Sequence, residues 1–173
     1  KVSDYIVNYL AEQGIEDIFV VYGAANGDLI DAFTRNEDTR YIAVMHEQGG
    51  GFAAEGWAKV KNEMGAMIVT SGPGGMNFVT SIGNCFYDSI PCLFITGQIN
   101  SNFMRPDESI RQIGFQETDI VNICKPITKY AKLVEKPEDI KYELQRAIHE
   151  ATSGRPGPVL LDIPINVQKQ HIE

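Results

Sequence analysis

Short apolar runs alternate along this chain with longer segments whose apolar residues recur at helical spacing. The short runs predict β-strands. Most of them lack polar alternation, which is typical of strands buried on both faces of a sheet. We expect six strands, at residues 17–22, 41–45, 65–70, 91–96, 125–134 and 158–163.

The longer segments predict helices between these strands. In the first helix Tyr5, Tyr9 and Leu10 share one face, Ser3 is suited to cap the start and Gly14 to end it. Strand-helix alternation predicts an α/β fold with three layers, in which helices cover both faces of a six-stranded parallel sheet. Further helices are expected at residues 28–33, with Asp28 as the cap, and at 46–62, 78–87, 116–123 and 137–151.

Polar or glycine-rich loops follow several of the expected strands. They lie at residues 23–27, 46–51, 71–77 and 97–116. In open parallel sheets, ligands bind beyond the carboxyl ends of the strands, where such loops gather. The pattern therefore predicts one binding site at this edge of the sheet.

Length and charge limit what the chain can bind. Its 173 residues suit one domain, and the 23 acidic and 15 basic residues give a net charge of -8. No lysine or arginine cluster offers a face to a phosphate backbone, so we expect no nucleic-acid partner. No apolar run could span a bilayer and no signal peptide is recognised, so we expect a cytoplasmic protein without a membrane partner.

The chain has three cysteines, Cys85, Cys92 and Cys124. Their spacing does not match a metal site, and we expect them to be buried reduced thiols.

The glycine loop at residues 71–75 follows the third expected strand. Its sequence, SGPGG, invites comparison with loops that bind phosphate at a helix N-terminus. It does not match GxGxxG, and GxxxxGK[ST] occurs nowhere in the chain, so independent dinucleotide binding is disfavoured. A tight turn without a ligand remains an alternative explanation of these glycines.

Glu47 stands at a strand end, where a carboxylate has two explanations. A glutamate in the first turn of a helix complements the helix dipole, which would be a purely structural role. However, Gly49, Gly50 and Gly51 follow it, and each disfavours a helix by about 1 kcal/mol relative to alanine. Close approach of a ligand or of another backbone would account for that cost. We also expect His46 to be buried or to lie behind the residues that contact a ligand.

Several long motifs, in order, resemble one enzyme family. They are HEQGG with AEGWAK, VTSGPGG-x-N, DSIPCLFITGQ, GFQETDIV with KPITKYAKLV, and ATSGRPGPVLLDIP. Together they cover nearly the whole chain and resemble the N-terminal pyrimidine-binding (PYR) domain of thiamine diphosphate enzymes. Among these enzymes the chain is most similar to the large subunit of acetolactate synthase (acetohydroxyacid synthase), a transferase of branched-chain amino acid biosynthesis.

The resemblance implies roles for individual residues. Glu47 would be the catalytic glutamate that hydrogen-bonds N1′ of the cofactor's aminopyrimidine and favours its imino tautomer. Sharing a proton with the ring would require Glu47 to be drier than a surface acid. Pro73 and Asn77 would line the pyrimidine pocket. The residues implied for the loop over the cofactor ring are Ala24 and Ala25, and those implied near the substrate and the reactive thiazolium are Phe115 and Gln116.

The family also implies partners. Its Mg²⁺ and the cofactor's diphosphate are held by a GDG motif followed by an asparagine on a separate domain, and no GDG occurs here. We therefore interpret residues 1–173 as a single PYR domain, excised or naturally separate, that carries half of a cofactor site and should be inactive alone. The other half is expected from a partner subunit, so the active unit would be at least a homodimer. FAD, where such enzymes use it, is held mostly by a middle domain that this chain does not include.

One segment departs from the family pattern. Residues 22–28 read YGAANGD, where typical acetolactate synthases carry a proline-glycine-glycine loop and a slightly longer linker. The loop approaches the thiamine ring, so three alternatives stay open beside pyruvate decarboxylation with transfer to a second 2-oxo acid. They are another 2-oxo acid decarboxylase, carboligase or oxidase of the same family, a nucleotide-binding module, and an assembly domain without catalysis.

Overall fold

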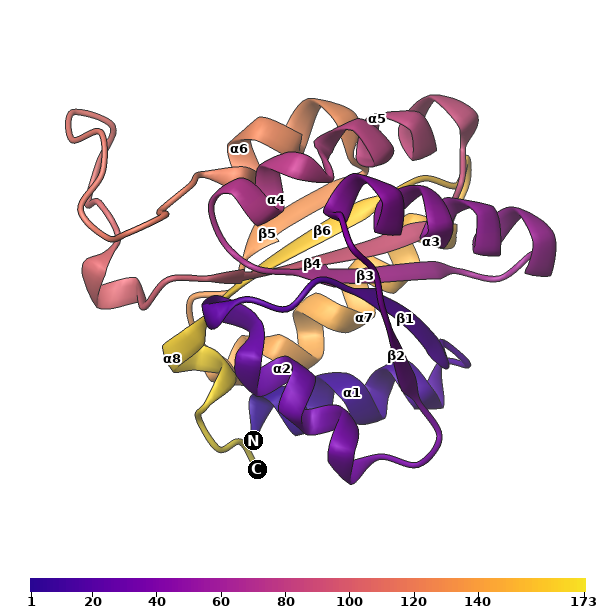
Figure 1. The fold of residues 1–173 in the computed structure, drawn as a ribbon, viewed down its shortest axis with the longest axis horizontal. Helices are drawn as coiled ribbons and strands as arrows, with labels where there is room; N and C mark the ends of the chain where they lie inside the picture. The colour runs from indigo at the N-terminus through magenta and orange to yellow at the C-terminus, as the bar shows by residue number, and fades with distance from the viewer.

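A computed structural model describes all of residues 1–173 as three layers, with a parallel sheet between two layers of helices (Figure 1). All strand pairs are parallel, in the order β2-β1-β3-β4-β6-β5. This confirms the predicted six-stranded α/β architecture. The strands are β1 (Asp17–Val20), β2 (Arg40–Ala43), β3 (Gly65–Val69), β4 (Cys92–Gln98), β5 (Tyr130–Leu133) and β6 (Val159–Pro164).

The inner strands are buried along their whole length, as their uninterrupted apolar runs predict. Every residue of β1, β3, β4 and β6 is buried, whereas the edge strands β2 and β5 are partly exposed. A strand between two neighbours in a covered sheet has no face left for water. The four inner strands therefore provide the rigid base for the loops at their carboxyl ends.

The helices divide between the two faces of the sheet. Helices α1, α2, α7 and α8 cover one face over a core of 23 buried apolar residues, and α3 to α6 cover the other over a core of 13 (Figure 1). The helices are α1 (Val2–Glu12), α2 (Gly27–Ala32), α3 (Glu47–Lys61), α4 (Pro73–Asn77), α5 (Val79–Asp88), α6 (Ile120–Cys124), α7 (Ile140–Thr152) and α8 (Ile165–Gln168).

Several element ends differ from the prediction. Helix α1 begins at Val2, and Ser3, expected as its cap, lies inside the helix and is buried. Asn26, not Asp28, stands at the cap position of α2. Pro73 opens helix α4 within the expected glycine loop, because proline fits the first position of a helix. Gly14 does follow the end of α1, with φ +75°.

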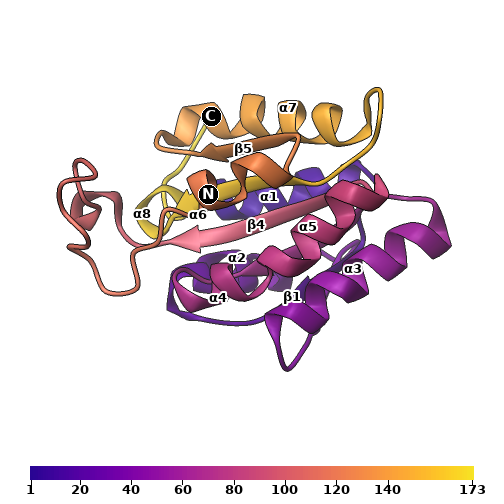
Figure 2. The same ribbon diagram turned by 90° about the horizontal axis from the view of Figure 1, so that it is seen from above.

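The region between β4 and β6 differs most. The expected helix at 116–123 is the shorter α6, which Asp119 caps by accepting from the backbone N–H of Asn122 at 3.2 Å. The expected strand at 125–134 forms only over β5, because its first half is a 3₁₀ turn that contains Pro126. The loop between β4 and α6 extends away from the body of the molecule beyond the carboxyl end of the sheet (Figures 1 and 2).

Candidate functional site

Glu47 begins helix α3 shortly after β2 ends. The backbone N–H of Gln48 donates to Nδ1 of His46 at 3.1 Å, so His46 caps the helix. Of the two expectations for His46, burial is wrong: the residue is exposed, and its ring caps the backbone of its own helix. That it lies behind residues that contact a ligand stays a prediction. Glu47 does lie in the first helical turn, where a carboxylate complements the dipole.

The Glu47 side chain also faces the loop after β3. It is half-buried, and its Oε2 accepts a hydrogen bond from Nδ2 of Asn77 at 2.9 Å. No donor of this chain bonds its other oxygen, Oε1. A Cβ on Gly74 would lie 2.8 Å from Cγ2 of Thr70, so this glycine lets α4 pack closely on the end of β3, and the same Cβ would only touch Oε1 of Glu47, at 3.5 Å. The carboxylate is thus oriented through one oxygen and available through the other.

The glycines after Glu47 have a different explanation from the one expected. A Cβ on Gly50 would lie 2.7 Å from the Val44 side chain, and one on Gly51 would overlap the Ser81 hydroxyl. Nothing lies within 4 Å of a Cβ on Gly49. Two of the three glycines therefore let α3 pack closely on side chains of its own chain, and not on a ligand or another backbone.

The loop after β1 is joined to the same region through Thr70. The backbone N–H of Ala25 donates to Oγ1 of Thr70 at 3.1 Å. Within the loop, Asn26 is buried and closes a turn, accepting from Gly23 N–H at 2.8 Å and donating to the carbonyl of Val21 at 2.9 Å. Ala25 is buried and Ala24 is exposed at the sheet edge.

Gln116 reaches the glycine loop from the opposite side. Gly72 has φ +61°, which L side chains rarely adopt, and its Cβ would lie 2.7 Å from Cβ of Gln116. Gln116 itself has φ +60°. The two backbones therefore meet at a position that excludes any side chain on residue 72. Phe115, its neighbour, is 82% exposed, and Pro73 is exposed as well.

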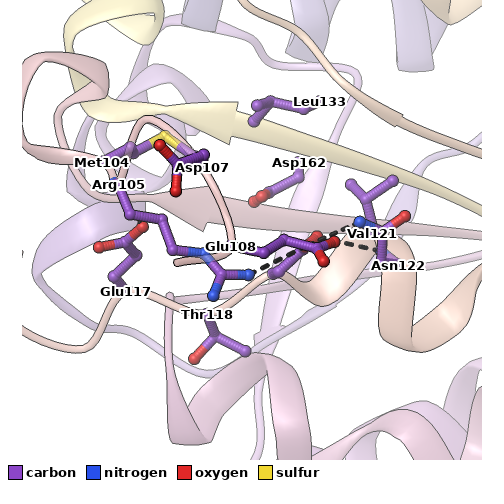
Figure 3. Close-up of a pocket in the computed structure, with 11 residues that line it drawn as sticks. Met104, Arg105, Asp107, Glu108, Glu117, Thr118, Val121, Asn122, Leu133 and Asp162 are labelled. Carbon is purple, nitrogen blue, oxygen red and sulfur yellow. Dashed lines mark hydrogen bonds and ion pairs between the residues drawn. The ribbon is translucent and has the colours of Figure 1, made fainter. Parts of the chain in front are cut away.

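A second polar group lies around Asp162, beside the extended loop (Figure 3). Asp162 of β6 is buried and accepts from Oγ1 of Thr96 at 2.6 Å and from Nε2 of Gln98 at 2.9 Å. Burial raises the pKa of Asp162 to about 7, although these two hydrogen bonds oppose the change and Asp119 adds to it. A cavity of about 320 Å³ lies above this carboxyl, lined by Met104, Arg105, Asp107, Glu108, Glu117, Thr118, Asp119, Val121, Asn122, Leu133 and Asp162.

Glu117 holds the extended loop together beside this cavity. Its carboxylate accepts from the backbone N–H groups of Arg105 at 2.7 Å and Ile113 at 2.9 Å. Burial alone would raise the pKa of Glu117, but these N–H donors, with that of Gly114, outweigh burial and lower it. The ordered carboxylate fixes the chain directly after Gln116.

Sequence reasoning missed three residues of this edge. Thr70 and Gly72 were seen only as part of a strand end and a turn, and Asp162 lay inside an apolar run. The signal for Asp162 was present: a lone carboxylate in a strand with no polar alternation must be buried and requires donors. The contacts of Thr70 and Gly72 join segments remote in sequence, so no local pattern contains them.

Comparisons with known proteins identify the family of the chain. Residues 1–123 match the family model described as "Thiamine pyrophosphate enzyme, N-terminal TPP binding domain". The chain is 42% identical over 170 residues to "Acetolactate synthase, chloroplastic" from Arabidopsis thaliana, which covers 98% of this chain and 24% of that protein. It is 41% identical over 168 residues to "Acetolactate synthase large subunit" from Corynebacterium glutamicum, covering 97% of this chain and 26% of that protein.

The chain spans about a quarter of the length of these relatives. None of its helices is long and apolar enough to cross a membrane. The family match covers the strands and loops that bring Glu47, Asn77, Ala25 and Gln116 to one edge of the sheet. With this match over most of its length, the chain belongs to the thiamine pyrophosphate enzymes, as their N-terminal cofactor-binding domain.

Proposed function

We propose that this chain is the pyrimidine-binding part of an acetolactate synthase-like enzyme. Such an enzyme decarboxylates pyruvate and transfers the two-carbon unit to a second 2-oxo acid. The observation that carries the proposal is the Glu47 carboxylate, held by Asn77 through Oε2 and free at Oε1. The similarity to acetolactate synthases supports the choice of reaction.

The residues around Glu47 fit an aminopyrimidine ring. A neutral ring nitrogen can share a proton with a carboxyl oxygen, and Oε1 is the oxygen that no protein donor occupies. Pro73, which opens α4, adds an exposed apolar surface. The backbone of Ala24 and Ala25 would lie over the ring. Thiamine diphosphate would supply the carbanion chemistry, while Glu47 would hold a proton at N1′ and Asn77 would orient Glu47.

The substrate would approach from the side of the extended loop. Gln116 meets Gly72 in the glycine loop, and Phe115 is exposed next to it. We propose that Gln116 contacts the cofactor and the 2-oxo acid, and that Phe115 covers the reacting groups when the site is complete. An exposed aromatic ring of this kind loses water contact when a partner or substrate covers it.

The rest of the site would come from other domains. We propose that residues 1–173 form one PYR domain, and that Mg²⁺ and the diphosphate bind to a domain of a partner subunit, in a homodimer or larger oligomer. Exposed apolar side chains support a covering partner: Tyr22, Met45, Phe52 and Met76 are all exposed, Met45 completely. FAD, if the enzyme uses it, would bind mainly to a middle domain.

Product analysis of the full-length enzyme tests this proposal. With thiamine diphosphate and Mg²⁺, pyruvate alone should give acetolactate, and pyruvate with 2-oxobutanoate should give acetohydroxybutyrate. The 173-residue chain alone should give neither. Another product from pyruvate would favour a different 2-oxo acid enzyme of the family, as the unusual loop at residues 22–28 allows. Acetolactate formation by the isolated chain would contradict the proposed half-site.

A further inference from the structure

Gln168 joins the C-terminal helix α8 to the loop after β1. Its side chain is fully buried, and its Nε2 donates to the carbonyl oxygen of Ala25 at 2.7 Å. The same nitrogen donates to the carbonyl oxygen of Ile163, also at 2.7 Å. The amide group of Gln168 thus links the end of β6 to Ala25, which lies 143 positions before Gln168 in the sequence.

Ala25 is held from two further directions. Its N–H donates to Oγ1 of Thr70 at 3.1 Å, which fixes it to the end of β3. The backbone of β4 passes so close that a Cβ on Gly97 would overlap the Ala25 carbonyl and lie 2.8 Å from the nitrogen of Asn26. Gln168 therefore supplies the side-chain donor to a carbonyl that is otherwise enclosed by backbone.

Only the nitrogen of the Gln168 side-chain amide makes hydrogen bonds. Its Oε1 is buried and has no hydrogen-bond partner. An unpaired buried acceptor costs about 1–3 kcal/mol. An apolar side chain of similar volume would avoid the cost of the unpaired Oε1, but it would leave the carbonyls of Ala25 and Ile163 without this donor. The presence of glutamine is therefore consistent with a requirement for its two N–H groups.

We propose that Gln168 is a positioning residue for thiamine diphosphate, acting through the carbonyl of Ala25 on the loop that would lie over the cofactor ring. The inference rests on the proposed function, because it assigns Ala24 and Ala25 to the cofactor. When Gln168 is present, the loop is fixed before the cofactor binds, so binding does not have to order it.

The test compares Gln168→Met with wild type in the full-length enzyme. Methionine is similar in length and has no donor. Thiamine diphosphate should bind at least tenfold more weakly, in titrations followed by intrinsic fluorescence, with kcat at saturating cofactor changed less than threefold. In the absence of cofactor, amide hydrogen exchange in the peptide covering residues 21–28 should be faster in Gln168→Met than in wild type. Gln170→Met is the matched control, since Gln170 is exposed, and it should change neither measurement.

A second variant keeps the test decisive if Gln168→Met folds poorly. In Gln168→Glu the protonated carboxyl keeps one donor and the ionised carboxyl has none, so cofactor affinity should recover as the pH falls. Unchanged affinity and unchanged exchange in a folded Gln168 variant would overturn the inference. If wild-type enzyme does not bind thiamine diphosphate at all, the proposed function fails, and the exchange measurement still reports whether Gln168 holds the loop.

Discussion

Ionisation of Asp162 should make the stability of this domain depend on pH. The side chain is 2% exposed, and burial raises its pKa from 3.8 to about 7 despite the hydrogen bonds from Thr96 and Gln98. An acid whose pKa is higher in the folded state binds its proton more tightly there. Its contribution to stability is fully present below pH 3.8 and is lost as the pH rises through 7.

The size of the effect follows from the two pKa values. A tenfold change in a proton-binding constant is worth about 1.4 kcal/mol, so full ionisation of Asp162 costs the folded state about 4 kcal/mol. At pH 5 the carboxyl is already mostly ionised in the unfolded chain, so part of this loss of stability has occurred by that pH. Between pH 5 and pH 8 the free energy of unfolding should therefore fall by about 2.5 kcal/mol because of Asp162.

Urea unfolding of the 173-residue chain, followed by the fluorescence of Trp57, measures this change. The side chain introduced in the Asp162→Asn variant cannot ionise. The variant should therefore lack the fall of about 2.5 kcal/mol in the free energy of unfolding between pH 5 and pH 8. The exposed Asp38 offers a control, and Asp38→Asn should keep the wild-type dependence. The reasoning is refuted if wild type and Asp162→Asn show the same change in stability over this range.

Three further substitutions test the packing and polar contacts around Glu47. Gly49→Ala should stabilise the chain by about 0.5–1 kcal/mol in urea unfolding, because the surroundings of Gly49 are open and alanine favours a helix. Gly51→Ala should destabilise the chain, because the added methyl group overlaps the Ser81 hydroxyl of α5. Equal effects of the two substitutions would contradict this packing. Asn77→Asp replaces a donor 2.9 Å from Oε2 of Glu47 by a second carboxylate, so cofactor affinity of the full-length enzyme should fall at least tenfold at pH 8 and partly recover at pH 6. Affinity that does not respond to pH would contradict the contact.

The sheet was predictable because its signal is local. Residues 65–70, 91–96 and 158–163 are apolar without alternation, and strands β3, β4 and β6 form there with every residue buried. The loops could also be placed at one edge, because all strands of a parallel sheet end on the same side. Expectations for β5 extended too far because Pro126 turns the chain before the strand begins.

The contacts within the edge were not predictable from local sequence. The cost of glycine in a helix is the same whether a ligand or a side chain lies beside it, so the explanation of Gly50 and Gly51 required the positions of Val44 and Ser81. The meeting of Gly72 with Gln116 likewise depends on how distant segments pack. The position of Glu47 at a strand end, before three glycines, marked it as a candidate, whereas only the resemblance to a family selected Asn77. The structure brings the two side chains within hydrogen-bond distance.

Replacement of Glu47 tests the central claim most directly. In the full-length enzyme with saturating thiamine diphosphate and Mg²⁺, Glu47→Gln keeps the size of the side chain but cannot share a carboxyl proton with the ring. Acetolactate formation from pyruvate should fall about 100-fold or more, with an unchanged unfolding temperature. Glu63→Gln, at an exposed position, is the matched control and should retain wild-type turnover. Near-normal turnover of Glu47→Gln would contradict the role assigned to this carboxylate.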